Sequence, residues 1–435
     1  MQTTSSAAWL DATTLWRGRA GNPVGLMRVE SGLADGLRRR LAGSLRCFAY
    51  DRRARRLITI DPAALDRPPP PRAIRREARD GWLRGLGRSI ERGIRHALRS
   101  VIGGAILWLR GRTAPPPPDG GAGDVAFCLG EIWAPDHLAA LRDWHERSHV
   151  RLVVVLYDLT PVLFPHWFSD RDLPAQFEAY LEYLRTAVDG VACISEATRR
   201  DFLDWAAARG GARGRVAAIR LGDRRPAAAP ACAPDGLAGL APGRFVLSVS
   251  TIQVRKNYDL LYALWRRFCE KGTPDLPVLV IAGRRGWLVD DLLTLIECDP
   301  LTAGHIVICD DPDDAALAWL YQNCRFTLYP SLYEGWGLPI AESFAYGKAC
   351  IASDTSSMPE ASQGLAIHVD PLDFVAWERE VASLIADDAR LAALEGAIRA
   401  RFRLHSWDDA AAALVALAAA PAPAERAVQG APAGE

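Results

Sequence analysis

The stretch from residue 329 to residue 344 constrains the fold of this chain more than any other stretch of the sequence. A strand-like run, residues 325–329, is followed by a loop in which Gly335, Gly337 and Pro339 prevent a regular element. Pro339 suits the first position of a helix. The following apolar residues give that helix a buried face: Ile340, Phe344 and Ala345. The sequence therefore predicts a strand, a tight loop and a helix in direct succession.

Two glutamates flank this loop, with Glu334 in the loop and Glu342 in the first turn of the predicted helix. On one continuous helix, residues eight apart would point roughly 80° away from each other. The loop between Glu334 and Glu342 instead allows both carboxylates to face one cleft. Carboxylates accept from hydroxyls, and loop amides near a helix N-terminus donate to anions, so the pattern suits a sugar attached to a phosphate. The alternative is an ordinary turn with two solvated glutamates.

Apolar runs at 152–156, 245–249, 278–282 and 306–309 predict strands, and Leu138, Leu141 and Trp144 mark a predicted helix. Other polar residues follow the predicted strands, where open α/β sheets place their sites. Arg255 and Lys256 come shortly after the apolar run 245–249, and Asp158 comes directly after the run 152–156. Ser195 follows another apolar run and is either a helix cap or a ligand contact. These positions predict a site built from several strand ends.

The loop residues Gly335-Trp336-Gly337-Leu338-Pro339, with Glu334 and Glu342 at either side, closely resemble the paired-glutamate motif of the family-four, or group 1, glycosyltransferases. The resemblance covers nearly the whole chain except residues 66–123 and the C-terminal tail, and it is strongest over residues 245–362. It implies the α/β GT-B fold, in which two Rossmann-like domains face a cleft.

The resemblance also implies roles for individual residues. Glu334 would accept hydrogen bonds from sugar hydroxyls, and Glu342 would accept from the ribose hydroxyls. Lys256, helped by Arg255, would stabilise the negative charge that grows on the leaving diphosphate. The other implied donor-binding residues are Gly335, Trp336, Gly337, Leu338, Thr251 and Gly25, and the acceptor-side residue is Asp158. Gly25 and Arg28 lie in a glycine-loop segment, residues 22–30, for which a plain turn is the equal alternative.

The expected activity is a metal-independent retaining hexosyl transfer from a nucleoside-diphosphate sugar to a glycan or lipid-linked acceptor in cell-surface polysaccharide synthesis. GDP-mannose is the expected donor, from similarity to bacterial polysaccharide mannosyltransferases, and no cofactor is expected. The alternatives are a non-catalytic nucleotide-sugar-binding subunit and an epimerase of the same fold. A glycosidase would also use two carboxylates, but it does not need paired cations beside them.

Composition shifts predict the insertion, the linker and the tail, and the resemblance implies the identity of the domains and of the crossover helix. The expected parts are an N-terminal acceptor-side Rossmann-like domain (1–226) with an insertion (66–123), a linker (227–243), a C-terminal donor-binding Rossmann-like domain (244–404), a crossover helix (405–418) and a disordered tail (419–435).

Charge and cysteine content narrow the function classes. The 435-residue chain has a formal net charge of zero, so nothing indicates a nucleic-acid partner. Its 9 cysteines form no C-x-x-C pair, which favours a reducing compartment without structural zinc or disulfides. No apolar run approaches the ~18 residues of a membrane span. We therefore expect a cytoplasmic protein.

The segment His145-Glu146-Arg147-Ser148-His149 matches the H-E-x-x-H pattern of zinc peptidases. Two histidines bind zinc in that pattern only when one helix carries both. Here the strand 152–156 follows so closely that the helix must end near His149. We expect a polar helix end rather than a metal site.

Residues 72–112 carry eleven arginines against three acidic residues, a net charge of +8. Apolar residues recur at helical spacing on the face opposite the arginines, and Trp108 follows. A cationic face opposite an apolar face is typical of a helix that lies on an anionic membrane. We expect this segment to bring the protein to the inner face of the cytoplasmic membrane as a peripheral protein. A disordered loop or a helix packed on its own domain are the alternatives.

Overall fold

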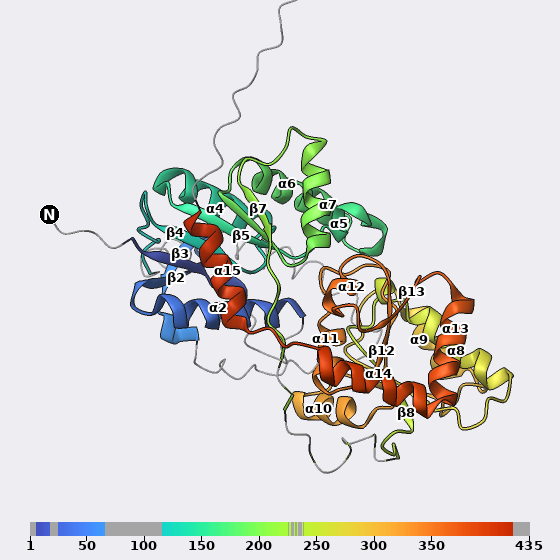
Figure 1. Cartoon of the computed structure of the whole chain (residues 1–435). Coiled ribbons are helices and arrows are strands. Elements are labelled where there is room, and N and C mark those ends of the chain that lie inside the picture. Colours follow the sequence, from blue (N-terminus) through green and yellow to red (C-terminus); the bar gives the residue numbers. More distant parts are fainter. Residues whose placement is uncertain are drawn as a thin grey trace, which may run out of the picture. The chain divides into compact units, whose positions relative to one another are not determined.

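The structure is a computed structural model that describes residues 6–17, 25–65, 115–224, 226–227, 230, 233, 237 and 239–420 (Figure 1). The chain divides into two compact units: unit 1 comprises Met1–Pro23 and Leu41–Leu152, and unit 2 comprises Val24–Arg40 and Val153–Glu435. The predicted membrane segment 72–112 and nearly all of the predicted tail 419–435 lie outside the described residues.

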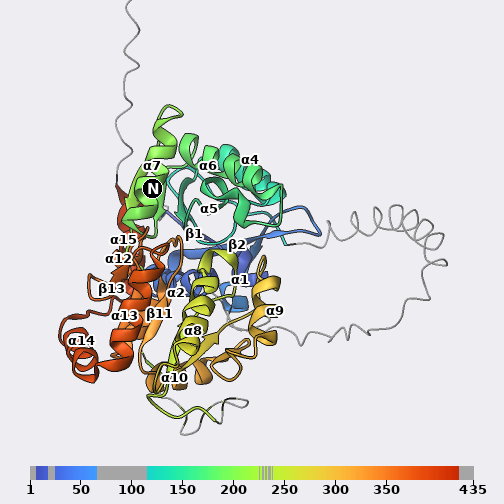
Figure 2. The ribbon, with the colours of Figure 1, turned by 90° about the vertical axis from the view of Figure 1, so that its right-hand side faces the viewer.

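Unit 1 is built on strands that follow the order β3-β2-β1-β4. Strand β1 runs parallel to β2 and β4, whereas β2 and β3 form an antiparallel pair. Figure 2 shows β1 and β2 side by side. The bounds are β1 Ala8–Asp11, α1 Thr13–Arg17, η1 Ala42–Ser44, β2 Leu45–Asp51, β3 Arg56–Ile60, η2 Pro62–Leu65, β4 Val125–Cys128 and α4 Pro135–Ser148.

Aromatic packing joins helix α4 to the strands of unit 1. The ring of Trp144 on α4 lies 4.9 Å from the ring of Phe48 and 6.2 Å from that of Trp9, centroid to centroid. All three side chains are buried, together with Leu138 and Leu141 on the same helix. The predicted helix around Leu138, Leu141 and Trp144 is therefore confirmed.

Unit 2 contains two groups of strands. The first group follows the order β5-β6-β7 and is parallel throughout. The bounds are α2 Gly25–Leu41, β5 Arg151–Leu156, α5 Thr160–Leu163, η3 Pro165–Trp167, α6 Leu173–Thr186, β6 Gly190–Cys193, α7 Glu196–Ala207, β7 Arg215–Ala218 and α15 Trp407–Ala419. Because β5 begins at Arg151, its first two residues belong to unit 1.

Helix α15 packs closely against α2, which Figure 1 shows as the red and blue helices lying together. Two glycines of α2 make this approach possible. A Cβ at Gly32 would lie 2.3 Å from the ring of Trp407, and one at Gly36 would lie 2.6 Å from the Cβ of Ala411. Ser406 caps α15 by accepting from the backbone N–H of Asp409, and the helix lies where the crossover helix 405–418 is expected.

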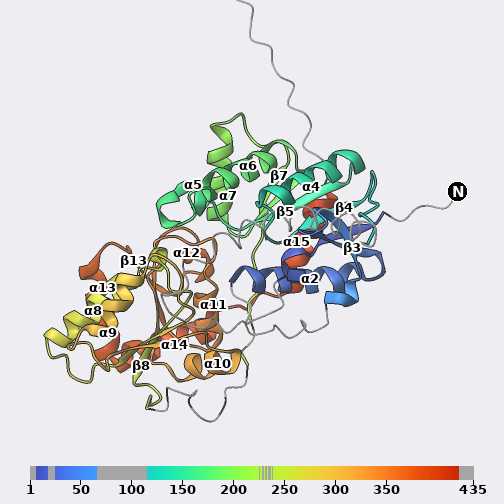
Figure 3. The same cartoon turned by 180° about the vertical axis from the view of Figure 1, so that it is seen from behind.

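The second group is a six-stranded sheet in the order β10-β9-β8-β11-β12-β13, and all its pairs are parallel. Figure 3 shows α8, α9 and α13 together beside it. The bounds are β8 Phe245–Val249, η4 Val254–Lys256, α8 Tyr258–Glu270, β9 Val278–Ala282, α9 Asp290–Cys298, β10 Ile306–Cys309, α10 Asp314–Asn323, β11 Thr327–Tyr329, α11 Leu338–Ala345, β12 Cys350–Ser353, α12 Met358–Ala361, β13 Ile367–Val369, α13 Phe374–Ala386 and α14 Asp388–Arg401.

Strand order in this sheet determines where a site can form. From β8 the chain proceeds outward through β9 and β10, and then returns to place β11 on the other side of β8. Strands β8 and β11 are therefore neighbours at the point where the winding direction reverses. Because the sheet is parallel, the loops after β8 and β11 leave from the same edge, and such a switch point is where open α/β sheets bind ligands.

The strands of this sheet confirm the pattern read from the sequence. Apolar runs at 245–249, 278–282 and 306–309 are strands with those bounds. They are apolar on both faces because helices cover a parallel sheet on both sides. Within the run 325–329, strand β11 spans Thr327–Tyr329, and the backbones of Arg325 and Phe326 hydrogen-bond to β8 just before it. Parallel strands connected by helices confirm the predicted α/β class.

Candidate functional site

The loop after β11 has the tight course that the sequence predicts. A Cβ at Gly335 would lie 2.2 Å from the carbonyl oxygen of Tyr157, so only glycine fits there. Gly337 has a φ of 132°, which favours glycine, and helix α11 begins at the next residue. The prediction for the helix start was wrong by one residue, because Leu338 rather than Pro339 is its first residue. Glu342 therefore lies just beyond the first turn.

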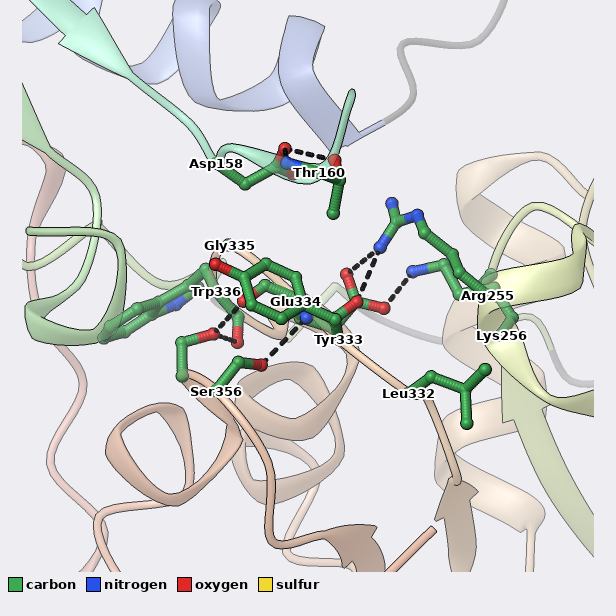
Figure 4. Close-up of polar contacts among 12 residues, drawn as sticks. Asp158, Thr160, Arg255, Lys256, Leu332, Tyr333, Glu334, Gly335, Trp336 and Ser356 are labelled. Carbon is green, nitrogen blue, oxygen red and sulfur yellow. Dashed lines mark hydrogen bonds and ion pairs between the residues drawn. The ribbon is translucent and has the colours of Figure 1, made fainter. Parts of the chain in front are cut away.

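Glu334 is buried between two cations. Its side chain is 7% exposed, and its Oε2 lies 2.7 Å from Nη1 of Arg255. Its other carboxylate oxygen accepts from Nζ of Lys256 (Figure 4). We call these three residues the diphosphate cluster, after the ligand that the sequence leads us to expect there. Burial alone would raise the pKa of Glu334, but Arg255 and Lys256 hold it at about 2.

Two serines of the segment before α12 hold the backbone of this loop. The N–H of Glu334 donates to Oγ of Ser356 at 2.9 Å, as Figure 4 shows. The single hydroxyl proton of Ser357 is shared between two carbonyl oxygens, that of Glu334 at 2.9 Å and that of Trp336 at 2.5 Å. The loop is thus fixed at three backbone groups around the carboxylate. Sequence reasoning assigned no role to either serine.

Lys256 is buried although it carries an amine. Its Nζ donates to the hydroxyl of Tyr329 at 3.0 Å and lies 5.2 Å from the centre of that ring. Burial and the neighbouring Arg255 lower the pKa of Lys256 to about 8, against the opposing effect of Glu334. The amine is therefore mostly protonated at neutral pH and loses its charge in mildly alkaline solution.

The side chain of Arg255 ties two loops together. Its Nη1 donates to the carbonyl of Tyr333 at 3.0 Å as well as to Glu334. Burial would lower the pKa of Arg255, but Glu334 and Asp158 raise it above its usual value, so the guanidinium stays charged. With two cations and one carboxylate, the diphosphate cluster carries one net positive charge in a largely buried position. Such a cluster favours an anion.

Asp158 lies in the loop after β5, as the sequence predicts. Its Oδ1 accepts from the backbone N–H of Thr160 at 3.0 Å and from the hydroxyl of the same residue. Figure 4 shows this loop across from Arg255 and Glu334. The carboxylate is thus oriented by its own loop.

Glu342 has contacts separate from those of Glu334. Its Oε1 accepts from Nη1 of Arg28 at 3.0 Å, and its Oε2 accepts from the hydroxyl of Tyr321 at 2.9 Å. The carboxylate is 8% exposed. Sequence reasoning placed Arg28 in the glycine-loop segment but did not pair it with Glu342. No local pattern could reveal a contact between residues 314 positions apart.

The remaining predicted residues lie at element ends. Gly25 is the first residue of α2, and Leu338 is the first residue of α11. Thr251 follows β8, beside Ile252, which bridges to Arg285. Trp336 is buried next to Gly335.

The zinc-peptidase pattern does not lie on one helix. Helix α4 ends at Ser148, and His149 has the left-handed conformation of a C-cap, with a φ of 55°. Among the residues that the structure describes, no group of three or more His, Cys, Asp or Glu side chains could hold a metal ion. Within the same residues, no helix is both long enough and apolar enough to cross a membrane.

The part of the chain that holds the diphosphate cluster is similar in sequence to known proteins. Residues 241–401 match the family model described as "Glycosyl transferases group 1". The chain is 30% identical over 167 residues to the O-antigen chain mannosyltransferase B of Escherichia coli. This match covers 38% of this chain and 43% of that relative. The chain thus spans less than half the length of this curated relative.

Solved structures match nearly the whole chain at low sequence identity. A sucrose-phosphate synthase from Thermosynechococcus elongatus has a TM-score of 0.60 over 95% of this chain and 98% of that chain, with 17% identity. Anabaena HepE, solved in complex with UDP-glucose, has a TM-score of 0.57 over 94% and 99%, with 14% identity. This likeness concerns the fold, which is GT-B with two Rossmann-like domains. The family model thus shows that residues 241–401 of this chain are similar to the group 1 glycosyltransferases, and the solved structures show the fold.

Proposed function

We propose that this chain is a retaining glycosyltransferase that moves a hexose from a nucleoside-diphosphate sugar to a glycan or lipid-linked acceptor in cell-surface polysaccharide synthesis. The diphosphate cluster carries the proposal. It lies at the switch point of a parallel sheet and holds Arg255 and Lys256 against one carboxylate. An excess positive charge beside a carboxylate and glycine amides suits a donor in which a diphosphate adjoins a sugar.

In the proposed reaction, the bond between carbon 1 of the sugar and the diphosphate oxygen breaks. The acceptor hydroxyl forms the new bond to carbon 1, and its proton goes to the departing diphosphate. Lys256 and Arg255 stabilise the charge that grows on the diphosphate, and they are fixed in place before the reaction begins. Glu334 keeps its negative charge at neutral pH, because its pKa is about 2, and accepts from sugar hydroxyls.

The proposed donor is GDP-mannose. Support comes from the similarity to an O-antigen chain mannosyltransferase, an enzyme named for mannosyl transfer. Because cations already face the expected diphosphate, the proposed reaction is independent of a divalent metal. The proposed site of action is the cytoplasm, at the inner face of the membrane where a lipid-linked acceptor would reside.

Turnover by the purified full-length chain tests the proposal. GDP-, UDP- and ADP-sugars are first screened by thermal shift, and release of the nucleoside diphosphate is then measured with glycan and lipid-linked acceptors. Glu334→Gln should reduce kcat at least tenfold, a loss of ~1.4 kcal/mol or more in transition-state stabilisation. A variant with more than a tenth of the wild-type kcat would remove Glu334 from the mechanism. NMR of the product anomer checks retention of configuration.

A non-catalytic nucleotide-sugar-binding subunit is the second candidate. The same buried cations would bind a donor in such a protein. Donor binding without release of the nucleoside diphosphate, across the tested acceptors, would favour the subunit over the enzyme.

A further inference from the structure

Glu342 is the centre of a chain of contacts that links three helices. Arg28 on α2 donates to Glu342 through Nη1 at 3.0 Å and to Asp314 through Nη2 at 3.3 Å. Asp314, at the start of α10, also pairs with Arg224 at 2.8 Å. Tyr321, on α10, donates to the other oxygen of Glu342 at 2.9 Å. We call these five residues the Glu342 network.

The Glu342 network differs from the diphosphate cluster in its charge. It combines two arginines with two carboxylates, Arg28 and Arg224 with Glu342 and Asp314, so it is neutral overall. The guanidinium of Arg28 is already shared between both carboxylates. Since both carboxylates offset its charge, Arg28 attracts a phosphate less than a cation without such partners would. The electrostatics therefore argue against a phosphate role for Arg28.

The hydrogen bonds of Glu342 leave room for two hydroxyls. An ionised carboxylate has about four lone-pair positions on its two oxygens. Arg28 uses one on Oε1, and Tyr321 uses one on Oε2. Burial and Glu342 raise the pKa of Tyr321 well above its usual value, so its hydroxyl keeps the proton that it donates. One acceptor position per oxygen then remains, which matches the two adjacent hydroxyls of a ribose.

We propose that Arg28 is a positioning residue that holds Glu342 for the ribose diol of the donor and thereby sets a preference for ribonucleotides over deoxyribonucleotides. This inference rests on the proposed function, because it needs a nucleotide donor. Without Arg28, one oxygen of Glu342 loses its charged partner and the carboxylate can rotate. Binding energy that depends on the orientation of the carboxylate is then lost, while contacts to the diphosphate remain.

The test compares ribose with dideoxyribose nucleotides by calorimetry. GDP and 2′,3′-dideoxy-GDP are titrated into wild type, Arg28→Ala and Arg28→Lys, with the uridine and adenosine pairs in parallel. Wild type should bind the ribose form about tenfold or more tightly, since hydrogen bonds to a charged acceptor are strong. Arg28→Ala should bring the ratio of the two dissociation constants close to one, because it weakens binding of the ribose form only. Arg28→Lys should restore part of the ratio, because it keeps the charge but lacks the planar fork.

Two further variants separate the possible causes. Lys256→Ala should weaken the binding of both the ribose and the dideoxy nucleotide and leave the ratio of their dissociation constants unchanged. Arg399→Ala removes an exposed arginine that pairs with Glu395 on the same helix, and it should change neither affinity. An equal loss for the ribose and dideoxy forms in Arg28→Ala would overturn the inference and indicate a structural or phosphate role. Failure of every nucleoside diphosphate to bind wild type would instead refute the proposed function itself.

Discussion

Replacement of Glu334 by glutamine should destabilise the protein as well as inactivate it. The position of Glu334 in a loop predicts that the fold tolerates the change, but the structure places its carboxylate 7% exposed between Arg255 and Lys256. Glutamine approximates the protonated, neutral form of the same side chain. The pKa of Glu334 is about 2 in the folded protein and 4.5 in the unfolded chain. A neutral side chain at this position therefore lowers the free energy of unfolding by about 3 kcal/mol at pH 7. Breaking a buried ion pair has a similar cost, about 3–5 kcal/mol.

Thermal unfolding measures this cost. For a cooperative unit of about 150–250 residues, each kcal/mol lowers Tm by about 2–4 °C, so Glu334→Gln should lower Tm by roughly 6–12 °C at pH 7. The matched control is Glu297→Gln, since Glu297 is 57% exposed and pairs with an exposed Arg285. The free energy of unfolding of Glu297→Gln should stay within about 0.5 kcal/mol of that of wild type.

The sign of the pH dependence gives a second check. The folded-state pKa of Glu334 lies below its unfolded value of 4.5, so its stabilisation is fully present above about pH 4.5 and is lost as the pH falls towards 2. The difference in the free energy of unfolding between wild type and Glu334→Gln should fall by about pH 3 to less than half of its value at pH 7. A second change, Lys256→Met, should recover part of the lost stability by removing an unpaired cation. A Tm unchanged within 1 °C in Glu334→Gln would refute the reasoning.

Three further predictions concern binding and activity. Because the pKa of Lys256 is about 8, affinity for a nucleoside diphosphate should weaken above pH 8 in calorimetry, and a flat profile to pH 10 would show that its charge is not needed. Gly335→Ala should lower both Tm and kcat, because the new Cβ would meet the carbonyl of Tyr157 at 2.2 Å; wild-type values for both would contradict this contact. Turnover should survive EDTA, whereas loss that Zn²⁺ restores would return His145 and His149 to consideration as ligands.

Sequence patterns predicted those parts of the fold that local chemistry determines. Apolar runs gave the strands of the six-stranded sheet, and Ser195 and Ser406 cap the helices that follow them. The loop at Gly335 and Gly337 was predictable because its backbone course requires glycine. These features depend on neighbours within a few residues, so one sequence suffices to find them.

Tertiary partners were not predictable in the same way. The sequence placed Glu334 in a loop but gave no measure of its burial between Arg255 and Lys256, 78 and more positions away in the chain. The pairing of Arg28 with Glu342 joins α2 to α11 and depends on how the helices pack. The resemblance to a family supplied the identity of the site residues, whereas their charge balance and hydrogen bonds required the structure.

The central claim is that Arg255 and Lys256 bind the diphosphate of a nucleotide donor. The most direct measurement is calorimetric titration of GDP and GMP into wild type and Lys256→Ala at pH 7, where the amine is mostly protonated. Wild type should bind GDP at least about tenfold more tightly than GMP, since a charged contact to the second phosphate is worth about 1.5 kcal/mol or more. Lys256→Ala should lose most of that difference while GMP binding changes little. Equal affinities for GDP and GMP in wild type, or an undiminished difference in Lys256→Ala, would contradict the claim.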